Sequence, residues 1–209
     1  MQQSPHPAAA WIRIMMGAAA IAVVLYSYFH VSAAGQRNPF DFFGYFTNQT
    51  SLATGVILIG AGLTRLRGRN MAWLVYARAI SVSCMMIVAV IYNGIVPGTG
   101  SAPAWVSASL HIILPAYVIA DWALVPDRPR LAWRTIWLVF PYPLTWLTVV
   151  LVRGATDGWV PYGFLLPSHG AASLSLHVAG LVIALWGAGA ITWAASRIQL
   201  GFRASSSAH

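Results

Sequence analysis

The sequence contains no lysine, no glutamate and a single cysteine, and only 8% of its 209 residues are charged. A soluble domain carries roughly 25% charged residues, so this chain has too little charge to cover a water-facing surface. The same scarcity excludes an intrinsically disordered chain, which combines low hydrophobicity with high net charge. Because Cys84 stands alone in an apolar run, the chain has neither a disulfide framework nor a cysteine-based metal site of its own.

Apolar side chains dominate instead, since hydrophobic residues make up 58% of the chain and the mean hydropathy is +0.68. A helix needs about 20 apolar residues to cross the hydrocarbon core of a bilayer. Six runs approach or exceed that length, at residues 11–33, 42–63, 71–95, 104–125, 133–152 and 172–196. We therefore predict an all-α, polytopic membrane bundle with six transmembrane helices.

Short joints rich in glycine, proline and arginine separate these runs and leave no room for a soluble domain. We predict one transmembrane domain over residues 11–196, with an N-terminal tail at 1–10 and a C-terminal tail at 197–209. Pro141 and Pro143 lie inside the fifth run and predict a kink or a locally broken helix, because proline has no N–H to donate.

The first run also allows an interpretation as a cleaved signal peptide. Arg13 lies near its start, and residues 31–34 (VSAA) resemble a cleavage site for signal peptidase. The apolar stretch is longer than the usual core of a signal peptide, of about 7–15 residues, which favours a retained first helix.

The charged residues indicate an orientation. All twelve basic residues are arginine, all four acidic residues are aspartate, and the net charge is +8. With the N-terminus inside, ten arginines fall on the inner side and only Arg37 and Arg153 on the outer side. Cytoplasmic loops carry the excess of positive charge, so we predict that both termini are cytoplasmic. The arginines are dispersed over short loops, which excludes a nucleic-acid-binding face.

The densest group of polar residues at membrane depth is at residues 47–51 (TNQTS), followed by Thr54. Its hydroxyl residues recur at i, i+3, i+4 and i+7 and form one stripe on a helix. Such a stripe is typical of close packing between membrane helices. Two adjacent carboxamides, Asn48 and Gln49, exceed what packing requires, so the group is also a candidate site.

Two histidines lie inside predicted spans, His111 in the fourth and His177 in the sixth. An ionisable residue at this depth is either a hydrogen-bonded structural residue or part of a site. In the predicted orientation Thr47, His111 and His177 all lie about 8–10 Å below the outer surface. One cavity near the outer leaflet could therefore receive all three. The residues predicted to support such a site are Asn48, Gln49, Thr50, Asn93 and His177.

Arg78 and Asp121 lie near the inner ends of the third and fourth spans, and we predict a partly buried structural ion pair between them. Asp121 follows His111 by ten residues, which is about 15 Å along one helix. It is therefore too far away to orient the histidine ring.

Three segments carry a family resemblance: residues 44–52 (GYFTNQTSL), Leu110-His111 followed by Pro115, and residues 159–165 (WVPYGFL). In this order they resemble the androgen-induced and androgen-dependent regulator family of small integral membrane proteins, and its bacterial relatives most closely. The resemblance extends over roughly residues 10–200.

Animal members of that family hydrolyse fatty acid esters of hydroxy fatty acids with a threonine nucleophile and a histidine. The resemblance implies that Thr47 is the nucleophile and His111 the base, that the substrate is a membrane lipid or lipid ester, and that neither a metal nor another cofactor takes part. It also implies a bacterial inner (cell) membrane. A threonine hydroxyl needs such a base to react at neutral pH. Asn48 or Gln49 is a candidate donor to the oxyanion.

Two other interpretations fit the same residues. In the first, the protein is a non-enzymatic membrane protein, a small transporter or an assembly partner, with His111 as a gate or a structural residue. In the second, His111 and His177 are the axial ligands of a b-type haem. For a catalytic His111, the candidate orienting residues are Asn93, Asn48, Asp41 and Asp157.

Overall fold

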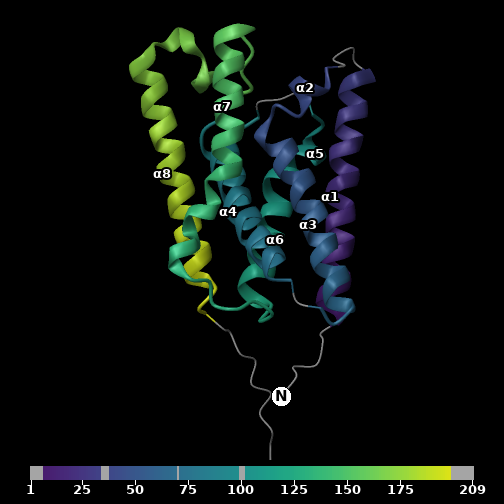
Figure 1. The fold of residues 1–209 in the computed structure, drawn as a ribbon. Helices are drawn as coiled ribbons and strands as arrows, with labels where there is room; N and C mark the ends of the chain where they lie inside the picture. Colours follow the sequence, from purple (N-terminus) through teal and green to yellow (C-terminus); the bar gives the residue numbers. More distant parts are fainter. Residues whose placement is uncertain (1–6, 34–37, 70, 99–101, 199–209) are drawn as a thin grey trace, which may run out of the picture.

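The structure, a computed structural model, describes residues 7–33, 38–69, 71–98 and 102–198. These residues form a bundle of helices and contain no β-strand (Figure 1). The bundle consists of α1 (Pro7–Ala33), α2 (Pro39–Phe42), α3 (Phe46–Leu66), α4 (Ala72–Gly94), α5 (Ala104–Ala108), α6 (Leu114–Leu124), α7 (Pro141–Thr156) and α8 (Ala171–Ala195). The all-α prediction is therefore confirmed for the described residues.

Two of these helices are extended by segments with another winding. A π-helical turn at Ser109–Ile113 joins α5 to α6, and a 3₁₀ segment at Trp133–Val139 precedes α7. The predicted break at Pro141 lies between this 3₁₀ segment and α7, where proline takes the first position of the helix. That position suits proline because the N–H it lacks would have no partner there. Two further 3₁₀ turns, Gly163–Leu165 and Pro167–His169, lead into α8.

Five of the described helices are long and apolar enough to cross a membrane. They are α1, α4, the continuous helix from α5 to α6, the 3₁₀ segment with α7, and α8. Helices of this length and composition indicate an integral membrane protein. Helix α3 has 21 residues but is not among the five, and its first turns contain the polar residues 47–51. The count of six spans therefore stays a prediction.

The observed helices differ from the predicted spans mainly at their ends. Helix α1 begins at Pro7 rather than at residue 11, so part of the predicted N-terminal tail is helical. The second predicted span began at residue 42, whereas α3 begins at Phe46 and residue 42 closes α2. Helix α7 continues to Thr156 instead of ending at residue 152.

Helix α4 lies at the centre of the bundle and contacts α3, α6 and α8. Helix α1 packs along α3 on one side, while α7 and α8 lie on the other (Figure 1). Glycines allow the close approach of α1 and α3, because a Cβ on Gly17 would lie 2.5 Å from the carbonyl oxygen of Gly55. Small residues serve this purpose in membrane helix pairs.

The bundle has two distinct ends. One end contains α2, α5 and the loop that follows α7, and we call it the loop end (Figure 1). At the other end α1 begins and α8 finishes, and we call it the terminal end. The two ends hold different groups of polar side chains.

Candidate functional site

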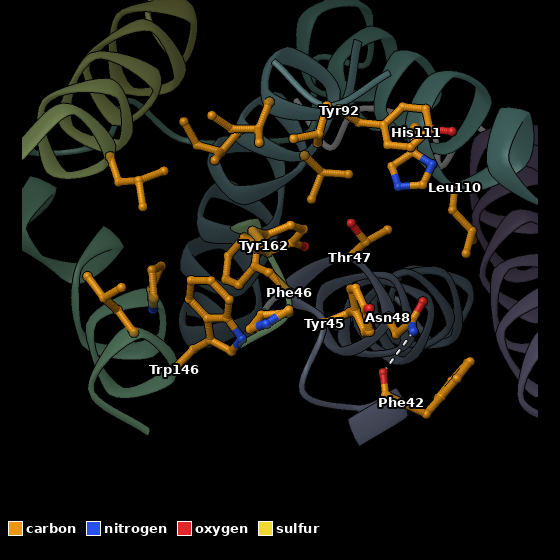
Figure 2. Close-up of a pocket in the computed structure, with 18 of the residues that line it drawn as sticks. Phe42, Tyr45, Phe46, Thr47, Asn48, Tyr92, Leu110, His111, Trp146 and Tyr162 are labelled. Carbon is orange, nitrogen blue, oxygen red and sulfur yellow. Dashed lines mark hydrogen bonds between the residues drawn. The ribbon is translucent and has the colours of Figure 1, made fainter. Parts of the chain in front are cut away.

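A cavity of about 680 Å³ lies inside the loop end of the bundle. Its walls come from α1, α2, α3, α4, α5 with its π-helical turn, α7, α8 and the loop after α7. Apolar and aromatic side chains make up most of the lining, and a few polar groups interrupt them (Figure 2). Among them are Thr47, Asn48, Tyr162 and His111. This combination of an apolar cavity and few polar groups is typical of small-molecule sites.

Thr47 is the second residue of α3 and is 8% exposed. A tight corner between α2 and α3 places it there. Gly44 occupies the corner, and a Cβ at this position would lie 2.2 Å from the ring of Trp159 and 2.8 Å from the carbonyl oxygen of Phe40. The indole N–H of Trp146 donates to the carbonyl oxygen of Gly44 at 2.8 Å. The corner is therefore fixed from outside the helix that carries Thr47.

The two carboxamides beside Thr47 bind the same corner. Asn48 Nδ2 donates to the carbonyl oxygen of Phe42 at 2.8 Å, and Gln49 Nε2 donates to that of Phe43. Asn48 lines the cavity, whereas Gln49 does not belong to its lining. The amide side chains of Asn48 and Gln49 thus stabilise the connection between α2 and α3.

Tyr162 lies beside Thr47 in the cavity (Figure 2). Burial raises the pKa of Tyr162 to about 12, and contacts with the side chain and backbone of Thr47 lower it by a smaller amount. Tyr162 therefore keeps its proton at neutral pH and offers the cavity a hydroxyl donor. Sequence reasoning did not single it out, although it belongs to the segment 159–165.

His111 is the central residue of the π-helical turn. Pro115, four residues later, has no N–H to give to the carbonyl oxygen of His111. Asn93 Nδ2, at the end of α4, donates to this oxygen at 3.2 Å and so replaces the missing partner. Asn93 itself is exposed and lies outside the cavity lining, so it acts on the backbone of His111.

The ring of His111 is held on one edge and on one face. Its Nδ1 lies 2.9 Å from the carbonyl oxygen of Ser107, and because a carbonyl only accepts, Nδ1 carries the proton. The neutral ring then has Nε2 free to accept a proton. Tyr92 stacks on the ring with 3.5 Å between centroids and an angle of 11°.

Thr47 and His111 therefore line one cavity and enter it from different elements (Figure 2). Among the described residues no hydrogen bond joins their side chains. No protein family, curated protein or solved structure matches this chain. The geometry of the cavity is thus the basis for any assignment of function.

Besides Gln49 and Asn93, two more residues predicted for the site lie outside the cavity lining. His177 binds the carbonyl oxygen of Ser173 through Nδ1 at 2.8 Å, stacks on Phe164 and does not line the cavity. The structure therefore does not bring His111 and His177 to one cavity, as a shared haem would need. Thr50 is 2% exposed, and its hydroxyl lies 2.9 Å from that of Tyr142, which makes it a packing residue.

The two aspartates at the loop end do not orient His111. Arg153 binds Asp41 at 2.8 Å and Asp157 at 2.9 Å. The guanidinium of Arg153 also stacks over Trp159, at 4.1 Å from the ring centroid. Asp41 lines the cavity, so this group ties its rim together.

The predicted partners Arg78 and Asp121 lie at the terminal end with 2.7 Å between Nη2 and Oδ2. They belong to a larger group, which we call the Arg–Asp cluster: Arg13, Arg65, Arg78, Asp121 and Asp127. Arg13 is 1% exposed and binds both aspartates. From the sequence, Arg13 counted only among the arginines of the inner side and Asp127 had no predicted role, so their burial together was not predicted.

Asp127 lies in the loop after α6 and receives three arginines. Burial tends to raise its pKa, but Arg13, Arg78 and Arg65 together outweigh burial and hold the pKa of Asp127 at about 2. Asp127 thus stays ionised at any physiological pH. Within the described ranges, no three residues among histidine, cysteine, aspartate and glutamate gather as a set of metal ligands.

Proposed function

We propose that the protein is a membrane-embedded hydrolase of lipid esters in which Thr47 is the nucleophile and His111 the base. The observation that carries the proposal is their joint position in the cavity of about 680 Å³, with Nε2 of His111 left as the free acceptor. The resemblance of residues 44–52, 110–115 and 159–165 to the androgen-induced and androgen-dependent regulator family supports the same roles.

The proposed reaction follows the usual order of acyl transfer. His111 Nε2 takes the proton from the hydroxyl of Thr47 while the Thr47 oxygen attacks the ester carbonyl carbon. The alcohol leaves with the proton from His111, and an acyl-Thr47 ester remains. A water molecule, deprotonated by His111, then releases the fatty acid and restores Thr47. Such base assistance contributes about 10²–10⁴-fold to the rate, and its hydrogen bonds are often long before substrate binds.

The oxyanion needs donors close to the Thr47 oxygen. The Tyr162 hydroxyl faces Thr47 and stays protonated at neutral pH, so we assign it the first of these contacts. In the first turn of α3, the backbone N–H groups of Asn48 and Gln49 already donate to the carbonyl oxygen of Tyr45. The amides of Asn48 and Gln49 already donate to the carbonyls of Phe42 and Phe43.

The composition of the cavity supports a lipid ester as substrate. Its lining is mainly apolar, which suits acyl chains, and its volume lies in the range of about 300–1,000 Å³ that small-molecule sites occupy. Thr47, His111 and Tyr162 provide polar groups in this lining, against which an ester group would bind. The substrate class is therefore an ester with at least one long acyl chain.

The membrane arrangement belongs to the same proposal. We place all six predicted helices across a bacterial cell membrane, with α3 as the second span. The terminal end, which holds the Arg–Asp cluster and exposed arginines such as Arg67 and Arg69, faces the cytoplasm. Positive residues gather on that side of a membrane. The loop end, and with it the cavity, then faces outward.

Labelling with a fluorophosphonate probe tests the assignment of the nucleophile. The purified protein should be labelled and should hydrolyse long-chain esters, and Thr47→Val and His111→Gln should lose at least about 100-fold in rate. Labelling and hydrolysis that survive both substitutions would contradict the roles of these residues.

Two control variants match these substitutions closely. His177→Gln removes a histidine that also binds the carbonyl oxygen four residues earlier but lies outside the cavity lining. Thr64→Val removes a hydroxyl that binds the carbonyls of Gly60 and Ala61. Both controls should keep full labelling and full hydrolysis.

One observation favours a second candidate function. Thr47 and His111 share no hydrogen bond, and no described carboxylate contacts the His111 ring. Without such activation the cavity could serve a non-enzymatic binding protein or a small transporter for an amphiphile. Ligand-dependent transport by the protein in liposomes, with no ester hydrolysis, would establish this alternative.

A further inference from the structure

A second, much smaller cavity lies between α3, α4 and α6, next to Arg78 and Asp121 of the Arg–Asp cluster. Its volume is about 10 Å³. The polar side chains in its wall are Thr54, Arg78, Ser81 and Asp121, and the remaining wall is apolar. Nothing in the proposed hydrolase uses this cavity.

The hydroxyl of Thr54 lacks the hydrogen bond that several other hydroxyls in this bundle make. Thr54 is 0% exposed, and its Oγ1 has no hydrogen-bond partner among the described residues. Other hydroxyls in the same bundle bind the carbonyl oxygen four residues earlier, as Thr64, Ser83, Thr148 and Thr192 do. Thr54 instead lines the cavity, and leaving a buried hydroxyl without a partner destabilises the fold.

The charges of the wall indicate what would satisfy Thr54. Arg78 contributes a guanidinium and Asp121 a carboxylate, bound to each other at 2.7 Å. A cation at this position would lie against Arg78, and an anion would lie against Asp121. A neutral molecule that both donates and accepts hydrogen bonds suits a wall with both charges.

Size restricts the candidates further. A cavity needs about 10–15 Å³ to hold one water molecule, which requires two to four polar partners. The cavity between α3, α4 and α6 offers that volume and four polar side chains. Any larger neutral molecule would require the helices to separate.

We propose that this cavity is a binding site for a single internal water molecule that bridges Thr54 and Ser81 to the Asp121 carboxylate. The water accepts a hydrogen bond from the Thr54 hydroxyl and donates one to an Asp121 oxygen. It therefore links α3 and α4 to α6 at the edge of the Arg–Asp cluster, and it extends the hydrogen bonding of the cluster to the serine and threonine side chains.

The sign of one stability change tests the site. Thr54→Val keeps the shape of the side chain and removes only its hydroxyl. With the bridging water, this change removes an anchor, and the Tm of the full-length protein in detergent falls by about 2–4 °C for each lost hydrogen bond of ordinary strength. Without the water, the change removes an unsatisfied hydroxyl, and the Tm stays the same or rises. Either of these last two results overturns the proposal.

Two further variants separate the hydroxyl from packing and test the shared water. Thr54→Ser keeps the hydroxyl and should keep most of the Tm, whereas a fall equal to that of Thr54→Val would assign the effect to packing. Ser81→Ala combined with Thr54→Val should cost less than the two single changes added together, because both remove contacts to one water. Strict additivity of the two changes would overturn the bridge.

Discussion

At the loop end, a cavity of about 680 Å³ has a mainly apolar lining whose polar groups are nearly all uncharged. At the terminal end, five charged side chains pack against one another, and the cavity beside two of them, Arg78 and Asp121, measures only about 10 Å³. Each aspartate of the Arg–Asp cluster binds at least two arginines, which allows a closed interior. In the large cavity, a ligand can supply the few hydrogen bonds that the uncharged polar groups do not make within the protein. Stability and ligand binding are thus assigned to opposite ends of one bundle.

The largest effect on stability is expected from Asp127→Asn. This change leaves Arg13, Arg65 and Arg78 with one carboxylate, and breaking a buried ion pair costs about 3–5 kcal/mol. Unfolding monitored in detergent should show this loss. Asp157→Asn, at an exposed aspartate of the loop end, is the control and should change little. Equal stability of the two variants would contradict the division between the ends.

A substitution at the loop end should affect both activity and stability. Gly44→Ala places a Cβ against Trp159 and the carbonyl of Phe40, and overpacking of this kind costs about 1–3 kcal/mol. Because Gly44 fixes the corner before Thr47, ester hydrolysis should fall as well. Gly163→Ala lies in the loop after α7, where a Cβ meets nothing within 4 Å, and should behave like the unchanged protein. Full hydrolysis by Gly44→Ala would show that the corner does not position Thr47.

Acid should weaken the terminal end through Asp127. The pKa of Asp127 is held at about 2 in the folded protein, below its ordinary value of 3.8, so its ionised form stabilises the fold above about pH 4. This contribution, about 2 kcal/mol, is lost as the pH falls from about 4 through 2. A pH series of Tm values measures it. The series for Asp127→Asn should lack the loss contributed by this group, and identical series would assign the acid sensitivity to other groups.

The smallest change in stability is expected from Arg153→Gln. Its ion pairs with Asp41 and Asp157 lie at the surface of the loop end, and exposed pairs contribute about 0–1 kcal/mol. The Tm should therefore shift by no more than a few degrees, and the shift should shrink in high salt. A loss as large as that of Asp127→Asn would remove the contrast between exposed and buried pairs.

The sequence allowed a prediction of the depth of each candidate residue along its helix, but not of the direction in which its side chain points. The apolar runs placed Thr47, His111 and His177 at one depth, and two of them line the cavity. The third does not, because depth fixes the height of a residue along a helix but not the side of the helix that faces a neighbour. Gln49 and Thr50 lie outside the lining for the same reason.

Other features depend on contacts between distant segments. The sequence paired Arg78 with Asp121, since both lie near the same end of adjacent runs. Arg13 and Asp127 are 114 residues apart, and no local pattern joins them. The π-helical turn at His111 was also beyond prediction, although Pro115 signals a carbonyl without its helical partner. The donor to that carbonyl, Asn93, comes from α4.

The position of Arg13 has a consequence for the order of synthesis. Asp121 follows Arg13 by 108 residues, which a ribosome adds in roughly 5–20 s at about 5–20 residues per second. During that interval the guanidinium of the first helix has neither of its carboxylates. An unpaired guanidinium is costly in hydrocarbon. Arg13 must therefore stay at the membrane surface or near another polar group until α6 and the following loop are made. Closure of the Arg–Asp cluster therefore requires α1, α3, α4 and α6 to be present together.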